Sequence, residues 1–112
     1  MLRSGLARLS DAANASLALE RRFDLVYNAA HALCLAALRR HGYRARHRYV
    51  VFQLLPHTLG LPPAAWRVLD EGHRLRNLGE YEGDLRITPR IVEDMIDATR
   101  QVAEAIARTA LQ

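Results

Sequence analysis

The sequence predicts an all-α protein, an up-and-down four-helix bundle with one short extra helix. Apolar residues recur at three- and four-residue spacings through four long segments, which is the period of an amphipathic helix. No stretch alternates convincingly between apolar and polar residues, as a half-buried strand would, and no internal repeat appears. With 112 residues, half of them apolar, the chain is expected to form one domain over residues 1–112.

The first two helices are predicted over residues 4–18 and 20–41. The apolar positions of the first repeat at helical spacing and are Leu6, Leu9, Ala13 and Leu17. The seam of the second consists of Phe23, Val26 or Tyr27, Ala30, Leu33 or Cys34, and Ala37. Gly42 follows as a stop, because glycine readily adopts the left-handed conformation found after helices. Cys34 is expected to be a small buried hydrophobe.

A short third helix is predicted over 46–58, ended by Pro56 and the break GLPP. The fourth helix is expected to start at Pro62 or Pro63, since proline is favoured in the first turn. Its seam consists of Ala65, Val68 or Leu69, Gly72, Leu75 and Gly79. We expect it to fray over 79–83.

The last helix is predicted from Pro89, capped by Thr88, to about residue 110. One face carries Ile91, Met95, Ala98, Val102 and Ala105. A second apolar stripe lies beside it and consists of Val92, Ile96, Ala103, Ile106 and Ala110. We therefore expect the last helix to serve both the core and a homodimer interface. The acidic residues Glu93, Asp94 and Asp97 are typical of a solvated face that favours the helix dipole.

Several classes of protein are disfavoured. The longest nearly apolar run, residues 29–38, is about half the length that a bilayer crossing needs, so no membrane association is expected. The first sixteen residues lack the apolar core of a signal peptide, which favours a cytoplasmic protein. The single cysteine allows no internal disulfide and no thiolate metal site. His41 and His47 do not have zinc-ligand spacing, and we expect neither a metal nor a cofactor.

The charge is basic and comes from arginine alone. The formal net charge is +4, and all 16 cations are arginines. Five arginines with interleaved histidines and tyrosines occupy residues 39–49, and we predict nucleic-acid contact by Arg44, Arg46 and Arg48. The alternative is a solvated corner between helices whose arginines cap backbone carbonyls.

Two polar stripes border the apolar seams of the second and fourth helices. On the fourth helix, the stripe is spaced at offsets of 0, 3, 4 and 7 residues and consists of His73, Arg76, Asn77 and Glu80. On the second helix, it consists of Asp24, Asn28 and His31. If these helices are neighbours, the predicted cleft is lined by Arg76, Asn77, Tyr81, His73, Asn28 and His31. The alternative is a hydrogen-bonded polar seam that fixes the register of the helices.

The order of elements resembles the HEPN family (higher eukaryotes and prokaryotes nucleotide-binding) over about residues 5–110. The resemblance is carried by YNAAHALCLAALRRHGYR on the second helix, then a short middle helix, and RNLGEYEG before a long capped helix. It implies a side-by-side homodimer. Many HEPN proteins are metal-independent ribonucleases of toxin–antitoxin and phage-defence systems, whereas others pair with small nucleotidyltransferases.

The family's nuclease signature is an arginine, often a polar residue, and then a histidine a few residues downstream. Arg76 matches the arginine and Asn77 the polar residue, but Tyr81 stands where the histidine would be. Arginine suits the stabilisation of phosphate charge, whereas tyrosine, with a pKa of about 10, is a poor base.

The resemblance therefore implies RNA or nucleotide binding at a homodimer cleft, with Arg76, Asn77 and Tyr81 as the catalytic or phosphate-orienting residues. Supporting contacts with the substrate are expected from Asn28, His31, His73 and Glu80. A cleaving enzyme would leave a 2′,3′-cyclic phosphate, with His73 or His31 supplying the imidazole. The alternatives are a non-catalytic partner of a nucleotidyltransferase and a structural dimer. We further expect Tyr81 to reach the cleft only if the helix opens at Gly79, because five helical residues turn about 140°.

Overall fold

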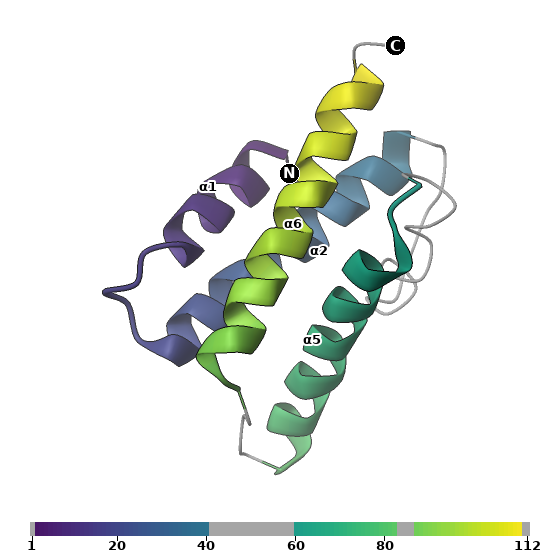
Figure 1. Ribbon diagram of the computed structural model, residues 1–112. Coiled ribbons are helices and arrows are strands. Elements are labelled where there is room, and N and C mark those ends of the chain that lie inside the picture. Colours follow the sequence, from purple (N-terminus) through teal and green to yellow (C-terminus); the bar gives the residue numbers. More distant parts are fainter. Residues whose placement is uncertain (1, 41–59, 83–86, 111–112) are drawn as a thin grey trace.

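The computed structural model describes residues 2–40, 60–82 and 87–110, and these residues form four α-helices and no strand (Figure 1). The helices are α1 (Leu2–Ala12), α2 (Leu19–Arg40), α5 (Pro63–Glu82) and α6 (Pro89–Ala110). The all-α class and the four-helix bundle are thereby confirmed. The extra helix predicted over 46–58 lies outside the described residues, as do Arg44, Arg46 and Arg48.

Consecutive helices run in opposite directions, and α2 and α6 form the centre of the bundle (Figure 1). Each of these two packs on the other and also on α1 and α5, which lie on opposite sides of the pair. No described helix is both long enough and apolar enough to cross a membrane.

Helix α1 is shorter than predicted and buries a different face. It ends at Ala12 instead of residue 18. The Asn14 side-chain oxygen accepts hydrogen bonds from the backbone N–H and the hydroxyl of Ser16, and this local turn competes with the helix. Its buried face consists of Gly5, Leu9 and Ala12, whereas Leu6 is 45% exposed. Helix α1 approaches α2 closely at Gly5, where a Cβ would lie 3.0 Å from the Leu33 side chain and would require that side chain to shift by a few tenths of an ångström.

The predicted seams of α2 and α6 are buried, except that Ile91 is half-buried, and most of the second stripe of α6 is buried as well. Val92, Ile96 and Ile106 are at most 3% exposed within one chain. These three side chains therefore belong to the core of a single chain, whereas the homodimer stays a prediction. A 22-residue helix packed against both α2 and α5 buries a wide face, and both stripes belong to that face. The Thr88 hydroxyl accepts a hydrogen bond from the Ile91 N–H at 3.2 Å, as the predicted cap requires.

Helix α5 approaches α6 closely at Gly72. A Cβ at this position would lie 2.5 Å from the terminal methyl group of Met95, which is fully buried. The predicted seam residues Ala65, Leu69 and Leu75 are buried beside it. The glycine thus allows the thioether of α6 to fill the space between the two helices.

Arg22 joins three helices from a buried position. Its Nε donates to the carbonyl of Ala12 at the end of α1 (2.9 Å), and its terminal nitrogen donates to Glu93 of α6 (2.6 Å). Glu93 is therefore more than part of a solvated face, because its carboxylate neutralises a buried guanidinium. No pattern in the sequence predicts this contact.

Candidate functional site

The polar stripes of α2 and α5 meet in the structure. Two residues of α2 and three of α5 make direct contacts, and we call them the α2–α5 polar cluster: Asp24, Tyr27, His73, Arg76 and Asn77. The α5 members lie at offsets of 0, 3 and 4 residues, so they share one helical face. Helix α5 packs chiefly on α6 and meets α2 along this polar edge.

Tyr27 is the buried centre of the cluster. The residue is only 1% exposed, and its ring is stacked with the rings of Phe23 and His73 at centroid distances of 6.3 and 6.2 Å. The phenol oxygen lies 2.9 Å from Nδ1 of His73. A buried phenol requires a hydrogen-bond partner, so this contact fixes the position of the imidazole.

The second nitrogen of His73 faces the more exposed side of the cluster. Nε2 lies 3.2 Å from the side-chain nitrogen of Asn77, which is an exposed residue on the next turn. Neutral imidazole has one donor and one acceptor nitrogen, whereas imidazolium has two donors. A phenol can donate or accept, and an amide can turn to present its oxygen. The cluster can therefore satisfy His73 in either protonation state.

Arg76 is positioned by a ring and by a carboxylate. Its guanidinium carbon lies 5.0 Å from the centroid of the Tyr27 ring, within the range of a cation–π contact. One terminal nitrogen donates to Asp24 at 2.7 Å. The Arg76 and Asp24 side chains are 24% and 49% exposed, so this ion pair lies at the surface edge of the cluster. A guanidinium in this position is fixed in orientation and within reach of an anion from solution.

The other predicted site residues are brought together only in part. Asn28 and His31 lie half-buried on the α2 stripe that begins at Asp24, one and two turns further along. The side chains of Glu80 and Tyr81 lie outside the described part of the chain. The backbone of α5 is helical through Glu82, so the condition set for Tyr81 to reach the cleft, an opening of the helix at Gly79, is not met. Position 81 therefore remains about 140° around the helix from Arg76.

Two members of the cluster were missed as site residues. Tyr27 was assigned to the apolar seam, and Asp24 was placed on the polar stripe without a partner. The phenol of Tyr27 could have indicated its role, because a tyrosine in a buried seam requires a hydrogen-bond partner from a neighbouring helix. Asp24 lies three residues before Tyr27 and hence on the same face.

The hollows on the α5–α6 side lie away from this cluster. One, of about 200 Å³, is lined by Arg67, Val68, Glu71, Ile91 and Asp94. This hollow lies on the opposite face of α5 from the cluster. At about 100° per residue, the mean direction of positions 67 and 71 is about 180° from the mean direction of positions 73 and 76. Its walls carry no imidazole. We therefore assign the candidate site to the polar cluster and not to this hollow.

Neither metal nor thiol chemistry is indicated by the described residues. They contain no group of three or more histidine, cysteine, aspartate or glutamate side chains close enough to share an ion. Cys34 is fully buried, and this burial raises the pKa of its thiol well above the ordinary value. It is a packed hydrophobe, as predicted.

Comparisons of the chain with protein-family models, curated proteins and solved structures find no match. The HEPN resemblance thus rests on the order of the elements and on the stretch RNLGEY.

Proposed function

We propose that the chain is a HEPN-type domain that binds RNA through Arg76, at a cleft that a second copy completes. The observation that supports this most directly is the position of the Arg76 guanidinium, held over Tyr27 at 5.0 Å and only partly buried. A guanidinium group can bind two phosphate oxygens through two parallel hydrogen bonds. When the arginine side chain is already held in place, it loses little further conformational entropy on binding. The basic net charge of +4 favours a polyanionic ligand.

The same cluster supplies groups for cleavage without a metal. In this reaction the ribose 2′-oxygen attacks the adjacent phosphorus and the bond to the 5′-oxygen breaks. The products are a 2′,3′-cyclic phosphate and a 5′-hydroxyl. His73 Nε2, which lies 3.2 Å from the side-chain nitrogen of exposed Asn77, would accept the 2′-hydroxyl proton, and water would supply the proton that the leaving 5′-oxygen takes up. Arg76 would stabilise the charge on the phosphorus oxygens.

Tyr27 would act as a positioning residue. Its phenol is buried and bonded to Nδ1, so it orients the imidazole without touching RNA. His73 thus provides the imidazole that the resemblance places further along the chain, at position 81.

Binding and cleavage are tested with one set of variants. Purified protein is incubated in EDTA with a fluorescein-labelled single-stranded RNA of about 12 nucleotides, and ATP is used in a parallel binding arm. Arg76→Ala is compared with Arg74→Ala, which removes the same charge from an exposed position on α5. We expect Arg76→Ala to weaken binding at least about tenfold, whereas Arg74→Ala changes it little. Equal affinities for wild type and Arg76→Ala would refute the proposal.

Cleavage is read from the same RNA by its products. His73→Gln and Tyr81→Phe are compared with wild type, and a cyclic phosphate end is expected only where His73 is intact. Cleavage that persists in His73→Gln would remove the role assigned to this imidazole.

One observation favours a purely structural seam instead. Arg76 and both nitrogens of His73 find partners inside the chain, as expected of residues that fix helix register. In that case Arg76→Ala lowers the free energy of unfolding while RNA binding is absent or unchanged. The nucleotidyltransferase partnership follows from the resemblance alone.

A further inference from the structure

The guanidinium assigned to phosphate binding already holds an anion from its own chain. Asp24 accepts a hydrogen bond from Arg76 at 2.7 Å, and the pair is at the surface. An incoming phosphate that uses the same edge of the guanidinium meets a resident carboxylate. The two anions cannot both occupy that edge at hydrogen-bond distance without repulsion.

We propose that Asp24 is a built-in competitor that lowers the affinity of the site for phosphate. This inference rests on the RNA-binding function proposed above and names the residue that regulates it. The Asp24 carboxylate is 49% exposed and is already partly hydrated. It can therefore rotate into water at a small cost in free energy when a phosphate takes its place on Arg76. Displacement of Asp24 is then part of ligand binding.

The Tyr27 ring orients Arg76 in addition to Asp24 and remains when Asp24 is neutralised. The Tyr27 ring lies against the guanidinium, and the ring itself is locked by Phe23 and His73. Neutralising Asp24 therefore removes the competing charge while the arginine stays in place. This separates competition from positioning: if Asp24 mainly positioned Arg76, its neutralisation would weaken phosphate binding.

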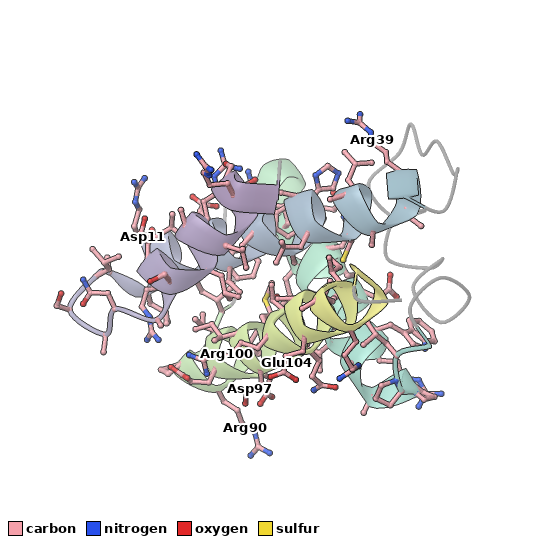
Figure 2. The ribbon with its side chains drawn as sticks, turned by 90° about the horizontal axis from the view of Figure 1, so that it is seen from above. Asp11, Arg39, Arg90, Asp97, Arg100 and Glu104 are labelled. Atoms are coloured by element: carbon pink, nitrogen blue, oxygen red, sulfur yellow. The ribbon has the colours of Figure 1, made fainter. Side chains whose placement is uncertain are left out.

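The test measures the affinity of the same labelled RNA by fluorescence anisotropy at fixed ionic strength. Asp24→Asn keeps the size of the side chain and removes its charge. Asp97→Asn adds the same net charge on the side of α6 that faces away from α1 and α2 (Figure 2). We expect Asp24→Asn to bind RNA about three- to fivefold tighter, which is the upper part of the range spanned by an exposed ion pair, and Asp97→Asn to change affinity less than about twofold. In the Arg76→Ala background, Asp24→Asn should give no gain.

Unchanged or weaker binding by Asp24→Asn overturns the inference. If Arg76→Ala still weakens the wild type in that case, the RNA site stands and only the role of Asp24 is lost. If neither wild type nor Asp24→Asn binds RNA in a manner that depends on Arg76, the proposed function fails as well. An equal gain in Asp97→Asn assigns the effect to net charge and also overturns the inference. Helicity is checked by circular dichroism, and Asp24→Ser replaces Asp24→Asn if that variant does not fold.

Discussion

Arg22 and Glu93 provide a quantitative test of how the bundle is held together. The Arg22 side chain is 9% exposed and Glu93 is 57% exposed, so the two partners of this ion pair differ greatly in burial. Arg22 also donates to the carbonyl of Ala12. Replacing either residue by alanine breaks the same ion pair, but it leaves a different group behind.

The burial of each partner sets the expected magnitudes. Arg22→Ala removes two hydrogen bonds and the packing of a buried stem, and it leaves the Ala12 carbonyl without this donor; we expect a loss of about 3 kcal/mol. Glu93→Ala leaves a buried guanidinium with one acceptor fewer. Because the carboxylate is more than half exposed, solvent screening limits this loss to about 1 kcal/mol. In Arg22→Ala the Glu93 carboxylate faces water, so removing it as well should have little further effect. The free energy of unfolding of the double variant should therefore fall by about 3 kcal/mol and not by about 4 kcal/mol, the sum of the two single losses.

The assay is urea unfolding followed by circular dichroism, arranged as a double-mutant cycle. Arg21→Ala and Glu104→Ala serve as matched controls, since both residues are exposed on α2 and α6, and each should cost less than about 0.5 kcal/mol. Additive losses in the double variant would show that the ion pair contributes nothing. A larger loss for Glu93→Ala than for Arg22→Ala would refute the reasoning from burial.

Two further predictions concern α5. Gly72→Ala should lower the free energy of unfolding by about 1 kcal/mol, because displacing buried Met95 outweighs the gain in helix propensity. In a Met95→Ala background the same change should stabilise the protein, and stabilisation in the wild-type background would contradict the packing argument. Arg74 donates hydrogen bonds to Glu71 and holds the pKa of that carboxyl below its ordinary value of 4.5. This contribution to the free energy of unfolding is present above pH 4.5 and is lost as the pH falls through the lowered pKa. The urea midpoint of wild type should therefore exceed that of Glu71→Gln at pH 7, and the difference should shrink as the pH is lowered toward 3. A difference that grows in acid would exclude this ion pair as its source.

The long helices were predictable because each buries a continuous stripe. The seam of α2 from Phe23 to Ala37 and the cap at Thr88 follow from spacing and from local hydrogen bonding. The end of α1 was not predictable from spacing, because the turn at Asn14 competes with a helical pattern that continues to Leu17. For the second stripe of α6, spacing shows that the face is apolar but not which neighbour covers it.

The residues of the candidate site could be predicted on α5, whereas the prediction for α2 was incomplete. Offsets of three and four residues place His73, Arg76 and Asn77 on one face of α5 whatever the tertiary fold. Their partners on α2 depend on the rotation and depth of a second helix, and this determines that Tyr27 and Asp24 make the contacts.

The sequence by itself determined the helical class, the faces of α2 and α5, and the polar stripe that carries Arg76. These depend on interactions within about four residues along the chain. The tertiary structure decided which side chains meet: Arg22 with Glu93 across 71 positions, and Arg76 with Asp24 across 52. Such pairs form only when packing brings distant helices within hydrogen-bond distance, and no local pattern encodes that distance.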